Sequence, residues 1–242
     1  MLGDNEDTLC KDCKKKYLMN FKCETKNDLN ILWLPENFSQ SRFTKSSKAS
    51  NACTLIVLLM CKRIERLDCR QLDTCFKEDF NMHSELIYVL AESILQGNLL
   101  HDRLLAHKPV RHMNLSIPEA IKAGGRELKS IKEWNSFIYL QDLTSSLYTE
   151  LKEKLTQCLT SIPDRTIYVI LIALNRSILL VIEHQGQGRI TLLDSHQHAP
   201  YGSVIVQTPA PNLQALCSWY CALLRHKCSM YELSFMYFPS AP

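Results

Sequence analysis

A run of apolar residues, Thr54–Met60, constrains this chain more than any other feature of its sequence. Side chains that are apolar on every face of a helix predict a helix buried in the core rather than on the surface. The run leads into Lys62, Arg63 and Arg66, and positive charge suits the C-terminal end of a helix dipole. Asn51 stands just before the run, where its short side chain can accept a hydrogen bond from the amides of the first turn. We therefore predict a central helix with Asn51 as its N-cap.

Cys53 falls in the first turn of this predicted helix. The free amides and the positive end of the dipole stabilise a thiolate there, and the thiolate is the form of cysteine that acts as a nucleophile. The chain holds eleven cysteines, however, and a free cysteine more often packs as a small apolar side chain than it reacts. A catalytic role for Cys53 therefore requires a matching base elsewhere in the sequence.

The composition argues against several classes of protein. A length of 242 residues allows one large domain or two small ones, and an apolar fraction of 46% is that of a globular protein. A net charge of +3 is too small to argue for nucleic acid binding. The seven glycines form no phosphate-binding loop, so no nucleotide or other cofactor is expected.

The sequence also carries no pattern that directs it to a membrane. The N-terminal residues lack the basic-then-apolar order of a signal peptide, and no apolar run reaches the roughly 18 residues that a membrane span needs. With no export signal, an odd number of cysteines predicts free thiols in a reducing compartment. We expect a cytoplasmic or nuclear protein that does not bind membranes.

The second half of the chain is rich in short β-branched and apolar runs. Residues 166–174, 177–185 and 189–196 are joined by tight-turn sequences, which predicts an antiparallel meander. A fourth strand over 201–208 and a closing strand over 231–238 are expected to complete this sheet.

The chain before residue 166 is predicted to be mainly helical. Apolar residues at helical spacing mark residues 83–105, where Gly97 is expected to separate two helices. Further helices are predicted over 115–125 and 145–163, with short strands at 31–36 and 137–140. Between the later strands, one more helix is predicted over 212–227. Residues 1–30 are polar and Lys-rich, which predicts a flexible lead. Residues 31–242 are then one α+β domain, in which the helix of Cys53 packs on an antiparallel sheet from the second half.

A candidate base stands at the end of the third strand of the predicted meander, residues 189–196, in the segment Asp194-Ser195-His196. Because neighbouring residues alternate across a strand, Asp194 and His196 point to the same side. A carboxylate beside an imidazole orients the ring and stabilises its charged form, which is the pair that a thiol nucleophile needs. Two alternatives stay open: these residues form an ordinary hydrogen-bonded turn, or His198 is the active imidazole.

A cysteine that opens a buried helix, followed by Asp-x-His at the end of a later strand, resembles the papain-like cysteine peptidases. The pattern is similar in particular to the herpesvirus large-tegument deubiquitinases, in which a glutamine upstream of the cysteine helps to bind the oxyanion. This resemblance implies a papain-like fold with Cys53, His196 and Asp194 as catalytic residues and Gln40 as an oxyanion donor. Asn51 resembles the oxyanion asparagine of the ubiquitin-specific peptidases.

The same resemblance implies hydrolysis of ubiquitin or ubiquitin-like conjugates through an acyl-enzyme, with that modifier as the protein partner. The chain departs from the family at two points. Glycines that usually crowd the nucleophile are absent, and Arg176 stands where SUMO-type peptidases carry their histidine. His184, at the end of the neighbouring strand, is a weaker substitute for that base. The alternative function is therefore a catalytically inactive relative that binds proteins through the same cleft.

A third hypothesis comes from the N-terminal cysteines. Cys10 and Cys13 form a C-x2-C beside the basic run Lys14–Lys16, and Cys23 follows, so this segment is a candidate zinc- or nucleic-acid-binding module. The two further ligands that a structural zinc site needs are missing at the usual spacing. Solvated thiols are therefore favoured, and no metal is expected.

Overall fold

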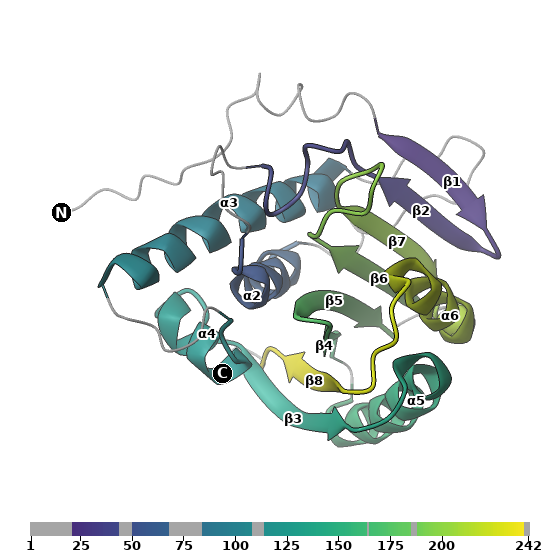
Figure 1. Ribbon diagram of the computed structural model, residues 1–242. Helices are drawn as coiled ribbons and strands as arrows, with labels where there is room; N and C mark the ends of the chain where they lie inside the picture. The colour runs from purple at the N-terminus through teal and green to yellow at the C-terminus, as the bar shows by residue number, and fades with distance from the viewer. Residues whose placement is uncertain are drawn as a thin grey trace.

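Figure 1 shows the computed structural model, which describes residues 21–43, 50–67, 84–107, 114–163, 165–184 and 188–239. Its elements are β1 (Lys22–Lys26), β2 (Leu29–Trp33), α2 (Cys53–Glu65), α3 (Ser84–His107), α4 (Ile117–Gly124), β3 (Lys132–Tyr139), α5 (Leu143–Ser161), β4 (Ile167–Ala173), β5 (Arg176–Glu183), β6 (Arg189–Asp194), β7 (Val204–Pro209), the short 3-10 helix η2 (Ala210–Asn212), α6 (Leu213–Leu224) and β8 (Tyr231–Tyr237).

The described strands form a single antiparallel sheet in the order β1-β2-β7-β6-β5-β4-β8-β3. Its centre is the meander of β4 to β7 that the turn sequences predict. Leu174 and Asn175 join β4 to β5 with φ of 52° and 58°, as a two-residue hairpin turn with the twist of the flanking strands requires. This turn lies at the end of the sheet where the candidate site is found.

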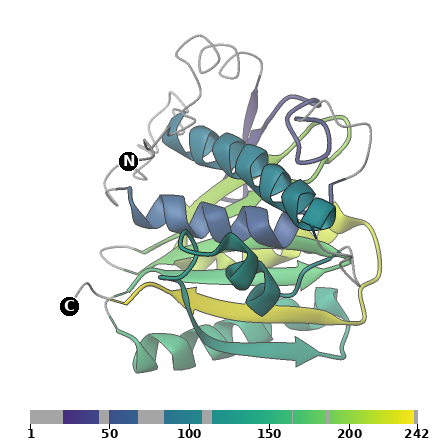
Figure 2. The same ribbon diagram turned by 90° about the vertical axis from the view of Figure 1, so that its left-hand side faces the viewer.

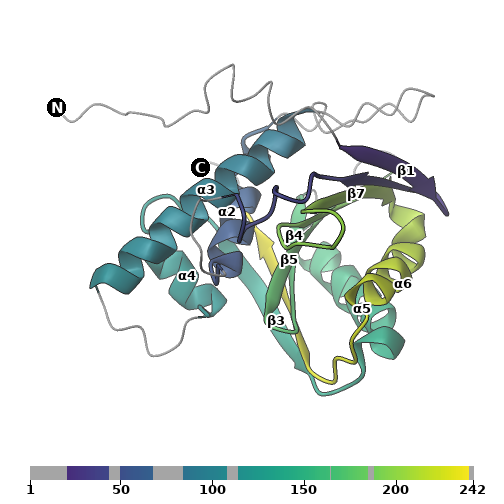
Figure 3. The same cartoon turned by 45° about the horizontal axis from the view of Figure 1, so that its top comes forward.

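Helices cover both faces of the sheet. Figure 2 shows α2, α3 and α4 on one side and α5 on the other, and Figure 3 shows α6 beside α5. Along β5 and β6 the side chains alternate between these two layers. Leu179 and Leu193 pack in the core under α2, whereas Leu180 and Leu192 pack in the core under α5 and α6. Because both faces are buried, the strands read in the sequence as continuous apolar runs.

The predicted buried helix is α2, which lies between α3 and β5. Every residue from Leu55 to Cys61 is fully buried, which explains why this stretch is apolar on all faces. None of the described helices is both long and apolar enough to span a membrane.

The helix α3 is continuous through Gly97, where two helices were predicted. A Cβ atom at Gly97 would lie 2.5 Å from Cγ1 of Ile56 on α2, which is closer than two carbon atoms approach. The glycine is therefore needed for the close packing of α3 on α2, and the contact outweighs the modest helix-weakening effect of one glycine.

The sheet begins earlier in the chain than predicted, because residues 22–30 lie in β1, β2 and the turn between them instead of in a flexible lead over 1–30. β1 is an edge strand, whose exposed polar side chains look like a solvated segment in the sequence. β1, β2 and β3 all precede residue 166, where the predicted meander begins, so the sheet is not built from the later segment alone. Cys10 and Cys13 lie outside the described residues.

Candidate active site

Cys53 is the first residue of α2, as predicted, and its side chain is almost completely buried. The residue at the N-cap is Ala52, not the predicted Asn51. The backbone N–H of Ala52 donates to Oγ of Ser50 at 3.2 Å, so Ser50 holds the turn that precedes the helix. Asn51 lies half-buried in the segment directly before α2.

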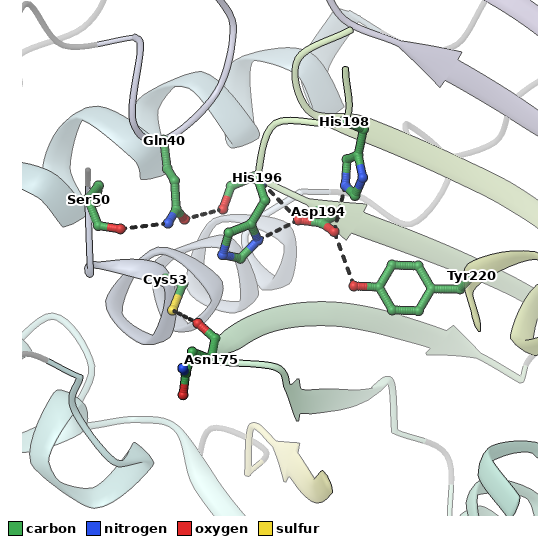
Figure 4. A network of polar contacts seen from close by, with 9 residues as sticks. Gln40, Ser50, Cys53, Asn175, Asp194, His196, His198 and Tyr220 are labelled. Atoms are coloured by element: carbon green, nitrogen blue, oxygen red, sulfur yellow. Dashed lines mark hydrogen bonds and ion pairs between the residues drawn. The ribbon is translucent and has the colours of Figure 1, made fainter. Parts of the chain in front are cut away.

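The start of β5 and the residues after β6 meet at the same end of the sheet. The two strands are antiparallel, with Leu179 opposite Leu193. Ser177, two residues before Leu179, and Ser195, two residues after Leu193, therefore lie at this end. The thiol of Cys53 reaches the same place, with its Sγ 4.0 Å from the backbone oxygen of Asn175 (Figure 4). Antiparallel register thus brings the Asp-Ser-His segment to the beginning of α2.

His196 is the imidazole that faces Cys53. Each of these two side chains shifts the pKa of the other, and Figure 4 shows the His196 ring lying between Cys53 and Asp194. Nδ1 of His196 lies 2.7 Å from Oδ1 of Asp194. Because Nδ1 is used for the carboxylate, Nε2 is the nitrogen that remains for the thiol.

Asp194 is completely buried and is held by four hydrogen bonds. Oδ1 accepts from the backbone N–H of His196 at 2.8 Å and from its Nδ1. Oδ2 accepts from Nε2 of His198 at 2.9 Å and from the hydroxyl of Tyr220 at 3.2 Å. An ionised carboxylate offers about four acceptor sites and no donor, so each of these partners must present a hydrogen.

Because all the acceptor sites of the Asp194 carboxylate are occupied, the roles of the two histidines are fixed. His196 carries its hydrogen on Nδ1, which leaves Nε2 to exchange a proton with Cys53. His198 directs Nε2 at Asp194 and supports the carboxylate, so the geometry favours His196 over His198 as the partner of the thiol. Tyr220 reaches Asp194 from α6, in the helical layer on the far side of the sheet from α2.

The electrostatics of the three residues favour an ion pair. Burial opposes ionisation of Cys53, but the hydrogen bond and positive charge of His196, aided by Ser177, outweigh it and lower the pKa of the thiol to about 7. Burial also disfavours the charged form of His196, yet Asp194 and then Cys53 raise the pKa of its imidazole to about 9. Between these two values the proton lies on His196, and the pair is thiolate and imidazolium.

Asp194 stays ionised for a related reason. Its burial favours the neutral acid, but the charges and hydrogen bonds of His196 and His198 hold the pKa of the carboxyl well below its usual range. The same negative charge and burial raise the pKa of the Tyr220 hydroxyl, which therefore remains a donor.

Other buried cysteines behave in the opposite way. Burial raises the pKa of Cys217 to about 12 and that of Cys158 to about 11. All seven cysteines among the described residues are free thiols, and the described residues include no group of three side chains able to hold a metal ion. Cys53 differs from Cys217 and Cys158 because a cationic imidazole faces it, not because of burial.

These pKa values predict how the reactivity of Cys53 depends on pH. Alkylation of Cys53 by iodoacetamide, followed by peptide mass spectrometry, is expected to rise with a midpoint near pH 7, below the usual thiol value of about 8.5. Any chemistry that also needs the imidazolium of His196 is expected to weaken again as the pH passes about 9. Cys217 serves as the internal control and should stay unmodified throughout. A midpoint for Cys53 at or above that of a free thiol would contradict the ion pair.

Gln40 lies buried in the loop after β2, close to this pair. Its Nε2 donates to the backbone oxygen of Ser50 at 3.0 Å, and its Oε1 accepts from the hydroxyl of Ser195 at 2.8 Å. Figure 4 shows the amide end of Gln40 pointing toward the space beside Cys53 and His196. The structure therefore brings together four residues singled out in the sequence: Gln40, Cys53, Asp194 and His196.

Neither the substitute base considered in the sequence, His184, nor Arg176, which stands in place of a histidine, provides the base. His184 follows β5 at the end opposite to Ser177, roughly 23 Å along the strand, so it cannot replace His196. Arg176 begins β5 at the site end, and its charge acts on the Tyr220 hydroxyl. A base at position 176 is unnecessary here, because the imidazole comes from the segment after β6.

Sequence reasoning missed two residues of the site. Ser177 contributes its hydroxyl and its backbone to stabilisation of the Cys53 thiolate, and Tyr220 completes the bonds to Asp194. A serine at the start of an apolar strand gives little signal by itself. A tyrosine on an otherwise apolar helix face predicts only that its hydroxyl finds a partner, without saying which.

Comparisons with known proteins show a likeness in structure but none in sequence. No protein family model and no curated protein matches this sequence. The fold is similar to the crystal structure of the ubiquitin-specific protease encoded by murine cytomegalovirus tegument protein M48, in complex with a ubiquitin-based suicide substrate. The likeness covers 87% of each chain with a TM-score of 0.52 and 12% sequence identity. It therefore establishes a shared α+β fold.

Proposed function

We propose that this chain is a cysteine peptidase with the papain-like arrangement, and that it cleaves ubiquitin or a ubiquitin-like modifier from conjugates. The observation that carries the proposal is the placement of the Cys53 thiol beside an imidazole whose Nδ1 is held by Asp194. A low-pKa thiol, a base and an orienting carboxylate are the parts that nucleophilic acyl transfer requires.

Each step of the proposed reaction uses one of these parts. The Cys53 thiolate attacks the substrate carbonyl carbon, and the π electron pair moves to the oxygen. When this oxyanion collapses, the C–N bond breaks, and the imidazolium of His196 gives its Nε2 proton to the leaving amine. The neutral imidazole then takes a proton from water, which attacks the thioester, and the Cys53 thiolate leaves. Asp194 keeps the Nδ1 hydrogen of His196 in place throughout.

The oxyanion of both steps needs donors that are already in place. We assign this role to Nε2 of Gln40 together with the backbone N–H of Cys53 in the first turn of α2, and Asn51 remains the alternative side-chain donor. Removing one such donor from a characterised protease costs on the order of 3 kcal/mol of transition-state stabilisation.

Support for ubiquitin as the substrate comes from the likeness in fold. The M48 protease is a ubiquitin-specific protease captured with a ubiquitin-based suicide substrate, and in the present chain the Asp-x-His pair and an upstream glutamine stand around a helix-opening cysteine. Composition and charge add nothing to this assignment.

One observation favours an inactive protein-binding relative as a second candidate. The side chain of Cys53 is only 5% exposed, and the carbonyl of Asn175 faces its sulfur. A substrate carbonyl must reach the same sulfur, so turnover requires the turn of Leu174 and Asn175 to make room. A relative in which this turn stays in place would bind a modifier without cleaving it.

The experiment that tests the proposal is intact-mass analysis after mixing the protein with ubiquitin that carries a C-terminal electrophile. We expect a mass increase of one probe molecule, because the thiolate adds to the electrophile once the ubiquitin tail is bound. The Cys53→Ala variant should form no adduct. A matched set of ubiquitin-like probes identifies the modifier if ubiquitin itself does not react.

Two outcomes would contradict parts of the proposal separately. Binding of ubiquitin without an adduct would favour the inactive relative. Fast alkylation of Cys53 by iodoacetamide, without binding of any modifier, would support a reactive thiol but contradict a ubiquitin-like substrate.

A further inference from the structure

Gln40 belongs to a buried polar network. The Gln40 side chain is only 3% exposed. Its backbone N–H donates to the backbone oxygen of Ser195 at 2.8 Å, and its backbone oxygen accepts from Nδ2 of Asn98 at 2.8 Å. With the side-chain bonds to Ser50 and Ser195 described above, every polar group of Gln40 has a fixed partner.

The chemistry of these partners determines which way the Gln40 amide faces. The backbone oxygen of Ser50 can only accept, so the nitrogen of the amide must face it. Oε1 then faces Ser195, whose hydroxyl must donate. The reverse orientation would set the amide oxygen of Gln40 against the Ser50 carbonyl. Nε2 has two hydrogens, and Ser50 uses one of them, so the second is left for a ligand.

Asn98, on α3, holds the backbone of Gln40 and the side chain of Ser50. Its Nδ2 bonds the backbone oxygen of Gln40, while its Oδ1 accepts from Oγ of Ser50 at 2.5 Å. Asn98 is itself buried, and it therefore ties together the two backbone segments that bear the donor and the acceptor of the Gln40–Ser50 bond.

We propose that Ser195 is a positioning residue for the reaction, and that it holds the Gln40 amide as the oxyanion donor. This inference rests on the proposed function, because only acyl transfer generates the oxyanion. Ser195 stands between Asp194 and His196, so one three-residue segment sets both the base and the oxyanion donor. The carboxylate and imidazole act on the thiol, while the serine between them acts on the amide.

The first test is a double-mutant cycle on hydrolysis of ubiquitin with a C-terminal aminocoumarin leaving group. Ser195→Ala is expected to lower kcat by roughly 10- to 100-fold with KM within about twofold, because a displaced donor is lost in the transition state and not in substrate binding. In a Gln40→Ala background, Ser195→Ala should cause no further loss. Losses that multiply would overturn the proposal.

Ser39→Ala is the matched control. Ser39 lies beside Gln40 in the same loop and is equally buried, but its hydroxyl has no hydrogen-bond partner. This variant removes one buried hydroxyl without touching the Gln40 amide, so its kcat should stay within about twofold of the unaltered protein. A loss in Ser39→Ala as large as that in Ser195→Ala would mean that Ser195 acts only through packing.

A second readout separates positioning of Gln40 from damage to the thiolate. Ubiquitin with a C-terminal propargylamide reacts at an alkyne, where no oxyanion forms. Ser195→Ala is expected to label at the unaltered rate while its amide hydrolysis falls. A parallel fall in both rates would overturn the proposal and assign Ser195 to the Cys53–His196 pair or to the fold.

A third measurement stands apart from the substrate. The Gln40 side-chain amide hydrogens, assigned in NMR spectra by their loss in Gln40→Ala, are expected to exchange slowly with water, and at least tenfold faster in Ser195→Ala. Unchanged exchange would overturn the positioning contact. If the unaltered protein hydrolyses no modifier, the proposed function is overturned, and the oxyanion role falls with it. Slow exchange would then still support the contact between Ser195 and Gln40.

Discussion

Replacement of Cys53 by serine is expected to reduce hydrolysis of a ubiquitin amide on the order of 10⁵-fold or more, as removal of a triad nucleophile does in characterised proteases. The oxygen nucleophile is nearly the same size, so the packing at the start of α2 is kept. The serine hydroxyl, however, has a pKa far above that of a thiol, and His196 cannot form a stable ion pair with it. The measurement is kcat/KM at pH 8, between the values of about 7 for Cys53 and about 9 for His196.

Cys61→Ala provides the comparison for this result. Cys61 lies two turns further along α2 and is fully buried, and burial raises the pKa of its thiol. Its replacement removes a packed sulfur and lowers the free energy of unfolding by about 1 kcal/mol, without loss of turnover. Equal activity in Cys53→Ser and the unaltered protein would exclude Cys53 as the nucleophile.

Asp194→Asn is expected to have the second largest effect, a loss in kcat on the order of 10⁴-fold, as in a triad with the equivalent change. The new amide has one NH2 group, which must face donors on at least one side of the former carboxylate. If the NH2 group faces His196, it favours the tautomer with hydrogen on Nε2, which cannot take a proton from the thiol. Loss of the negative charge also lowers the pKa of His196 and raises that of Cys53, so the alkylation midpoint should move above pH 7.

The same substitution is expected to destabilise the fold. Whichever way the amide turns, its NH2 group faces a buried donor: the backbone N–H of His196 on one side, or His198 and Tyr220 on the other. This costs about 1–3 kcal/mol, measurable by urea denaturation. Tyr220→Phe removes only one of the four bonds to Asp194 and keeps the carboxylate, so its loss of activity should be much smaller. Retention of kcat within tenfold in Asp194→Asn would show that the carboxylate does not orient His196.

The central part of this fold could be predicted because its signals are local. Thr54–Met60 is apolar on all faces, which specifies a buried helix, and the turn residues between the β4 and β5 segments specify an antiparallel hairpin. The positions of Cys53 and of the Asp-Ser-His segment then follow from where these elements begin and end. Their mutual contact does not follow from periodicity. It depends on strand register and on the packing of α2 against β5, which only the structure supplies.

The wrong predictions concern residues whose role is decided by tertiary contacts. Gly97 reads as a helix end, but its lack of a side chain is used for contact with Ile56. Asn51 is a good N-cap by type, yet Ser50 fixes the turn before the helix and leaves Ala52 at the cap. The sequence of β1 predicts a solvated segment, because the strand lies at the edge of the sheet, where polar side chains are tolerated.

The supporting residues of the site were missed for the same reason. Tyr220 contacts Asp194 only because α6 packs against the opposite face of the sheet. Asn98 lies on a helix whose sequence pattern predicts only that it is amphipathic. Its hydrogen bonds to Gln40 and Ser50 depend on how α3 packs over the segments that contain these two residues.

The hydrogen bond between Ser195 and Gln40 joins residues 155 positions apart in the chain, and this separation bears on how the protein is made. Closing so long a loop is entropically costly, so contacts of this kind form late in folding. During synthesis the thiol leaves the ribosome well before its base. An unassembled chain therefore carries Cys53 as an ordinary, weakly nucleophilic cysteine, and the reactive group exists only in molecules that have completed their fold.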